Sequence, residues 1–275
     1  MNLPAQDYRC YRHPDREAYI SCQRCERMIC PDCMRDASVG FHCPECVTEG
    51  AKTIRAPRTI AGGAVSANVG RVSFVLIGLN VVAYIAQLAT EGQPDSVFQR
   101  GAMQSYAVAD GDYWRLLTAA FLHGSLLHIA FNMYALYLFG PFVEKALGTA
   151  RFIAAYLTTA IASSVFVYWL ENPLTPTIGA SGAVFGLFGM ALLLLLRAKQ
   201  DVTTLLVLLA INAVISLQGN ISWQGHLGGF VAGCILGAAF AYAPRDRKQA
   251  VQVFVFAAVW IAMIAAILIR TGQLN

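Results

Sequence analysis

The chain has 275 residues, of which 57% are hydrophobic and 13% charged, so it is more apolar than a soluble domain of this size needs to be. A net charge of +4 without a basic helix or an aromatic–basic stripe argues against nucleic-acid binding. Charge and cysteine are concentrated before residue 58, and long tracts after residue 71 have no charged residue. We therefore predict a small polar head followed by a polytopic membrane body.

The head, residues 1–50, carries four pairs of metal-binding side chains, each pair separated by two residues. The pairs are Cys10 with His13, Cys22 with Cys25, Cys30 with Cys33, and Cys43 with Cys46, and His42 precedes the last pair. Four pairs supply two tetrahedral sites, so we predict two structural Zn²⁺ ions. A disulfide-bonded head is the alternative, but it needs an oxidising compartment, whereas the charge pattern described below places the head in the cytoplasm.

The interleaved order of these pairs resembles the cross-braced B-box and RING zinc fingers of the treble-clef type. That resemblance implies Cys10, His13, Cys30 and Cys33 on one ion, and Cys22, Cys25, Cys43 and Cys46 on the other. His42 could replace Cys43, and the sequence does not decide between them. Closed zinc sites stabilise small folds, so we expect the head to bind or regulate, with a cytoplasmic protein as partner, and not to catalyse.

After a linker in residues 51–70, hydropathy predicts seven membrane-spanning helices. Their ranges are 72–89, 125–142, 152–170, 179–196, 203–218, 222–243 and 251–269. The uncharged run over 202–243 is too long for one crossing of about 20 residues, and Gln218-Gly219-Asn220 offers a polar break, so we divide it into two helices. The predicted fold is an all-α polytopic membrane protein with a six-helix core in 71–243 and a seventh helix in 244–275.

Lys and Arg near the helix ends predict the orientation of the body. With the N-terminus inside, only three such residues are outside, namely Arg100, Arg115 and Arg270, while the cytoplasmic side holds Lys52, Arg55, Arg58, Arg71, Lys145, Arg151, Arg197, Lys199, Arg245, Arg247 and Lys248. We therefore expect a cytoplasmic N-terminus and an outer C-terminus. We see no cleaved secretion signal or transit peptide, and favour a multi-pass protein of a bacterial plasma membrane. In the outer connection 90–124, Trp114 and Arg115 are expected to anchor at the membrane interface.

Ser181 and His226 lie at the starts of the fourth and sixth spans, which both enter from the outer face. Polar groups at membrane depth are costly, so function is the default hypothesis for them. A serine hydroxyl beside an imidazole is the minimum for an activated nucleophile, and no carboxylate lies within the predicted spans to make a triad. Glycines on both spans would let the helices approach closely; they are Gly225, Gly229, Gly233 and Gly237, with Gly182, Gly186 and Gly189.

His128 and Asn132 begin the second span, four residues apart, on one helix face and at a depth similar to that of Ser181. They are candidate donors to the oxyanion of a tetrahedral intermediate, where each donor is worth roughly 3 to 4 kcal/mol of barrier. Phe185, one turn beyond Ser181, is the expected neighbour of the His226 ring.

Taken in order, these motifs resemble the rhomboid intramembrane serine proteases. The order is Trp114-Arg115, His128-x3-Asn132, Gly140-x3-Glu144-x3-Gly148-x3-Phe152-x3-Tyr156, Gly179-Ala180-Ser181-Gly182 and Gly225-His226-x2-Gly229-x3-Gly233. The resemblance covers about residues 70–243 and implies a rhomboid-like six-helix core. It implies that Ser181 is the nucleophile, that His226 is the general base and acid, and that His128 and Asn132 stabilise the oxyanion. Glu144 and Arg115 would be structural.

Two positions depart from the family pattern: Gly225 stands where many rhomboids have Ala, and Phe185 where a Tyr is often found. Neither departure removes a reacting group. The predicted function is thus a serine endopeptidase that cleaves transmembrane substrates near the outer membrane face and needs no cofactor for catalysis.

Two other classes of function were weighed. A non-catalytic rhomboid-like adaptor would bind transmembrane helices and present the zinc head to partners, but such pseudoproteases usually lack the Ser and His that are present here. A metal transporter would need acids and histidines at several depths, whereas the histidines of the spans cluster at one end.

Overall fold

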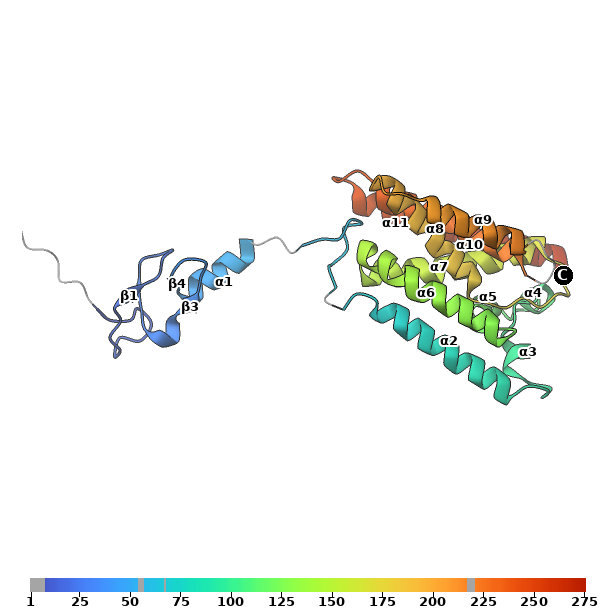
Figure 1. Cartoon of the computed structure of the whole chain (residues 1–275), viewed down its shortest axis with the longest axis horizontal. Coiled ribbons are helices and arrows are strands. Elements are labelled where there is room, and N and C mark those ends of the chain that lie inside the picture. Colours follow the sequence, from blue (N-terminus) through green and yellow to red (C-terminus); the bar gives the residue numbers. More distant parts are fainter. Residues whose placement is uncertain (1–7, 54–56, 67, 217–220) are drawn as a thin grey trace, which may run out of the picture. The chain divides into compact units, whose positions relative to one another are not determined.

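The computed structural model describes residues 8–53, 57–66, 68–216 and 221–275. The chain forms two compact units, Met1–Pro57 and Arg58–Asn275, and Figure 1 labels most of their helices and strands. Each unit is described by itself.

The head is built from short elements around a core of cysteines. Its elements are β1 (Ile20–Ser21), β2 (Met28–Ile29), η1 (Pro31–Cys33), β3 (Arg35–Asp36), β4 (Phe41–His42) and α1 (Pro44–Thr53). β1 pairs with β2 and β3 with β4, both antiparallel. In the described head, Ala18 and Ile29 are the two members of the buried cluster that are not cysteines. So little apolar surface cannot stabilise a fold of this size without a further crosslink.

In the membrane body, a helix overlaps each of the seven predicted ranges within the described residues. The helices are α2 (Arg71–Ala89), α6 (Leu126–Leu147), α7 (Thr149–Leu170), α8 (Ser181–Arg197), α9 (Thr203–Ser216), α10 (Trp223–Tyr242) and α11 (Lys248–Leu274). Five of them are long and apolar enough to cross a membrane, while α8 and α9 are shorter apolar helices. The body is therefore a multi-pass membrane protein, and seven crossings stay a prediction. The predicted break at Gln218-Gly219-Asn220 lies outside the described residues.

The connection in residues 90–124 is folded into short helices, namely α3 (Val97–Gly101), α4 (Ser105–Ala109), α5 (Arg115–Thr118) and the 3-10 helix η2 (Ala119–Phe121). Trp114 is 54% exposed, as an interface residue would be. Arg115 is only 9% exposed, which agrees with the structural role that the rhomboid resemblance implies for it. Its guanidinium donates to the Asp112 carboxylate at 2.9 Å and to the carbonyls of Gln99 and Ala102 at 2.6 and 3.0 Å, so it ties the connection together.

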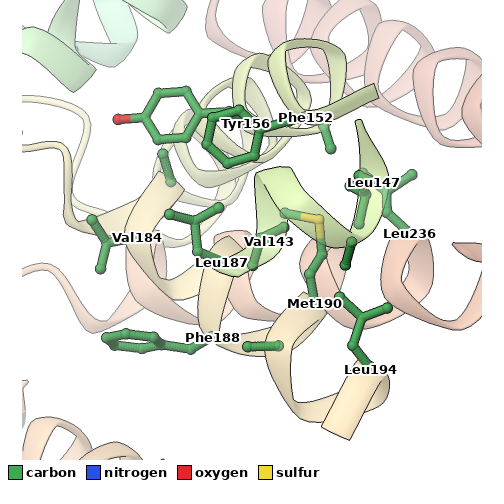
Figure 2. Close-up of a cluster of buried hydrophobic side chains, with 14 of the residues drawn as sticks. Val143, Leu147, Phe152, Tyr156, Val184, Leu187, Phe188, Met190, Leu194 and Leu236 are labelled. Atoms are coloured by element: carbon green, nitrogen blue, oxygen red, sulfur yellow. The ribbon is translucent and has the colours of Figure 1, made fainter. Parts of the chain in front are cut away.

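The core of the body lies between α6, α7, α8 and α10, whose large side chains interlock as shown in Figure 2. α8 and α10 meet through their glycines, because a Cβ built on Gly229 would lie 1.8 Å from the Gly182 carbonyl oxygen and one on Gly233 2.2 Å from that of Gly186. The predicted small-residue faces therefore bring two backbones into direct contact. α2, α9 and α11 leave most of their apolar side chains exposed, as lipid-facing helices do.

The seventh helix, α11, is held to the body by polar contacts. Trp169 Nε1 donates to the Ala266 carbonyl at 3.0 Å, and Arg270 Nε donates to the Tyr168 carbonyl at 3.0 Å. At the other end, Gln252 Nε2 donates to the Ala61 carbonyl at 2.9 Å. α11 begins three residues earlier and ends five later than hydropathy predicts, and these added ends also have partners: Lys248 Nζ donates to the Ile60 carbonyl at 2.7 Å, and Thr271 Oγ1 lies 2.9 Å from the Tyr168 hydroxyl.

Candidate active site and metal-binding clusters

Ser181 is the first residue of α8, and a glycine turn leads into it. Gly179 has φ +134, which favours glycine, and its N–H donates to the Ala119 carbonyl at 2.9 Å. A Cβ at Gly179 would lie 2.8 Å from His128 Nε2 and 3.4 Å from Ser181 Oγ. No side chain in the described part of the chain caps α8, so its first N–H groups stay available beside Ser181.

His226 lies in the first turn of α10 and is 8% exposed. Its ring stacks on Phe185, with centroids 4.1 Å apart and planes at 11°. Because Phe185 is four residues after Ser181, this contact puts the imidazole on the Ser181 face of α8. Among the described residues, the Ser181 hydroxyl has no hydrogen-bond partner, so Ser181 and His226 are not hydrogen-bonded in this structure. Catalytic hydrogen bonds in substrate-free enzymes are often long and tighten only when substrate binds.

The sequence analysis missed one residue at this site, Ser216, the last residue of α9. Its Oγ lies 2.7 Å from His226 Nδ1 and 2.6 Å from the carbonyl oxygen of Asn212. A sequence signal for it was available, because Ser216 is a polar residue in an apolar helix and ends α9, while His226 lies in the first turn of the next helix, α10. The rule applied to Ser181 and His226 would also have selected it.

His128 and Asn132 stand together on α6. The Gly124 N–H donates to His128 Nδ1 at 3.3 Å, so a neutral His128 carries its proton on Nε2, the atom next to Gly179. Asn132 is 6% exposed, and its amide donates to the His128 carbonyl at 3.0 Å. The His123 ring packs edge-on against the His128 ring, with centroids 5.0 Å apart, and so restricts its movement. A nitrogen donor of His128 thus faces the turn that precedes Ser181.

Glu144 lies inside α6, because the helix ends five residues beyond the predicted span. Its carboxylate accepts hydrogen bonds from the Gly70 N–H at 3.0 Å and the Thr149 hydroxyl at 3.2 Å. These partners join α2, α6 and α7 at the end of α6 remote from His128. Glu144 is therefore structural and supplies no third catalytic group.

The first cluster of the head groups Cys10, His13, Cys30 and Cys33. His13 Nδ1 lies 3.8 Å from the Cys10 sulfur, 3.3 Å from that of Cys30 and 3.4 Å from that of Cys33. A tetrahedral zinc ion would separate nitrogen and sulfur ligands by about 3.5 Å. Burial raises the pKa of Cys10, but backbone N–H groups, including that of Arg12, outweigh it and lower the pKa to about 6. In the same cluster, burial and hydrogen bonds to Cys10 and Cys30 raise the pKa of Cys33 to about 11, so Cys10 is the thiol that favours the thiolate near neutral pH. Zinc binding requires deprotonated ligands.

The second cluster groups Cys22, Cys25, Cys43 and Cys46. The sulfurs of Cys25 and Cys43 lie 3.8 Å apart, close to the separation of about 3.8 Å that two sulfurs have around tetrahedral zinc. All of these cysteines are free of disulfides. His42 belongs to neither of the two clusters found among the described residues, so the geometry favours Cys43 as the ligand. The grouping of both clusters coincides with the cross-braced order.

Comparison with known proteins covers the membrane body. The Rhomboid domain family matches residues 110–243, a range that includes Ser181, His226, His128 and Asn132. The chain is 36% identical over 135 residues to "Putative rhomboid protease YdcA" of Bacillus subtilis (strain 168), which covers 47% of this chain and 68% of that protein. It is 32% identical over 177 residues to rhomboid protease GluP of the same organism, covering 61% and 34% of the two chains. It is also 25% identical over 212 residues to rhomboid protease AarA of Providencia stuartii, covering 65% and 75%.

Proposed function

Because the chain belongs to the rhomboid family, several of whose members are named proteases, we propose that it is an intramembrane serine endopeptidase with a Ser181–His226 dyad. One observation carries this proposal beyond the family likeness: the His226 ring stacks on Phe185, one helical turn from Ser181. A buried imidazole on the same face as a serine at a helix N-terminus is the arrangement that nucleophilic catalysis needs.

In the proposed reaction, Ser181 Oγ attacks the substrate carbonyl carbon while His226 Nε2 accepts the hydroxyl proton. The negative oxygen of the tetrahedral intermediate would meet the backbone N–H groups at the start of α8 and the positive end of its dipole. His128 Nε2–H and the Asn132 amide are the proposed side-chain donors. His226 then returns the proton to the leaving amine, and a water molecule activated by the same imidazole releases the acyl group from Ser181.

The proposed substrates are transmembrane segments. A helix in lipid hides its carbonyls in hydrogen bonds, so a segment must unwind locally before Ser181 reaches one. Glycine, proline or polar residues near the scissile bond would favour unwinding. Since Ser181 starts a helix that is proposed to enter from outside, cleavage would occur near the outer face and release the outer domain of the substrate. This orientation, and placement in a bacterial plasma membrane, rest on the distribution of Lys and Arg.

The head is proposed to bind two structural Zn²⁺ ions, one in each cluster, and to present a surface to a cytoplasmic protein. The ligand distances fit tetrahedral zinc, and the cysteine-filled core offers few apolar contacts that could replace the metal. The proposed division is a zinc domain in residues 1–50, a linker in 51–70, a catalytic core in 71–243 and an additional helix in 244–275. Zinc takes no part in the proposed peptide hydrolysis.

Labelling with a fluorophosphonate tests the dyad directly. The detergent-solubilised protein should react covalently at Ser181, whereas Ser181→Ala and His226→Ala should not. Ser66→Ala, which removes a loop serine before α2, is the matched control and should label like the native chain. Equal labelling of the native chain and His226→Ala would refute the dyad. A native chain that neither labels nor cleaves a transmembrane peptide would favour the non-catalytic adaptor.

A further inference from the structure

Ser216 is buried although most of the helix that carries it, α9, is exposed. In the described chain, Leu205 and Ser216 are the buried residues of α9, while neighbours such as Val214 and Ile215 are exposed. A lipid-facing helix thus turns one hydroxyl, 4% exposed, toward the ring of His226.

The distances around Ser216 Oγ determine which group donates each hydrogen bond. A serine hydroxyl has one hydrogen, and Ser216 Oγ lies 2.6 Å from the Asn212 carbonyl, which can only accept. That hydrogen therefore goes to Asn212, and the 2.7 Å contact with His226 Nδ1 must be a bond in which the imidazole N–H donates to Oγ. The neutral ring then carries its proton on Nδ1 and has its lone pair on Nε2.

We propose that Ser216 is a positioning residue for His226, holding the tautomer in which Nε2 can accept a proton from Ser181. Stacking on Phe185 defines the plane of the imidazole but allows a half-turn about the Cβ–Cγ bond within that plane, and the bond to Ser216 removes this freedom. It takes the place that a carboxylate has in a triad, without a charge. When His226 becomes an imidazolium during the reaction, Nδ1–H still donates to the same oxygen. This inference rests on the proposed dyad.

Removing the hydroxyl should leave the buried Nδ1–H without an acceptor, which favours the opposite tautomer. An unpaired buried donor is disfavoured enough to shift an equilibrium about 10- to 100-fold. We therefore expect Ser216→Ala to lower kcat by about 10- to 100-fold with little change in KM, because Ser216 is buried and only 4% exposed. Ser216→Thr keeps the hydroxyl and should retain most of the activity. Thr204→Ala, an exposed position on the same helix, is the matched control and should behave as the native chain.

The experiment measures kcat and KM for a fluorogenic transmembrane peptide in vesicles, and the tautomer of His226 by ¹⁵N NMR of histidine-labelled protein, with His226→Ala to assign the signal. The native chain and Ser216→Thr should show the Nδ1–H form, and Ser216→Ala should show a shift to the Nε2–H form. A native Nε2–H form, or unchanged kcat in Ser216→Ala, would overturn the inference. The tautomer reports on Ser216 even if the native chain cleaves nothing, so failure of the proposed function is recognised separately.

Discussion

Gly229 lies where α10 crosses α8, and its replacement by alanine should separate the two helices that carry the proposed dyad. A Cβ at this position would lie 1.8 Å from the Gly182 carbonyl oxygen and 2.7 Å from its carbonyl carbon. Both atoms belong to backbone, so no side chain can rotate away. The helices must move apart by roughly 1.5 Å before the new contact becomes ordinary for close-packed atoms.

This movement has an energetic and a kinetic consequence. Overpacking a tight contact costs about 1 to 3 kcal/mol, and the higher helix propensity of alanine returns only about 1 kcal/mol. Misplacing a catalytic group by about 1 Å can lower the rate by about 100-fold. We therefore expect Gly229→Ala to lose most fluorophosphonate labelling and to unfold at a lower temperature than the native chain.

The assay compares labelling rate and thermal unfolding of the purified protein with those of Gly78→Ala. Gly78 lies in α2 and a Cβ there would meet nothing within 4 Å, so that variant isolates the effect of helix propensity. It should label normally and be as stable as the native chain or slightly more so. Native labelling and stability in Gly229→Ala would refute the claim that backbone contact at this crossing holds Ser181 and His226 together.

Three further predictions concern other parts of the molecule. Metal analysis by plasma mass spectrometry should find about two zinc ions per chain, and Cys22→Ser should retain about one, because each cluster has four ligands; a chain without zinc would contradict the head assignment. Phe185→Leu should lower kcat for a transmembrane peptide by about 5-fold through loss of a ring contact worth about 1 kcal/mol, with Phe185→Tyr unaffected; equal rates would show that stacking is dispensable. Arg115→Leu should lower unfolding stability by roughly 2 to 4 kcal/mol, measured by denaturant titration, since it leaves Asp112 and two carbonyls unpaired; an unchanged midpoint would argue against a structural role.

Local composition was sufficient to predict most of the helices and the candidate dyad. Apolar runs fall on α2, α6, α7, α8, α9, α10 and α11, because a helix in lipid must be apolar along its length. Ser181 and His226 stood out as polar residues at matching ends of such runs. The metal-ligand pairs could also be predicted from the sequence, because the two-residue spacing that places both ligands on one turn is a local property of the chain.

Only the tertiary structure decided which distant groups meet. Arg115 is buried within the protein because carbonyls from separate turns converge on it. Cys43 lies in a cluster and His42 does not. His42 ends strand β4, and in extended chain neighbouring side chains point in opposite directions, so only one of the two can face the metal ligands. Ser216 contacts His226 because the end of α9 lies beside the first turn of α10. Hydropathy describes how a single segment partitions into lipid. The contacts of Arg115, Cys43 and Ser216 instead depend on how several helices and loops pack against one another, which the sequence of one segment does not determine.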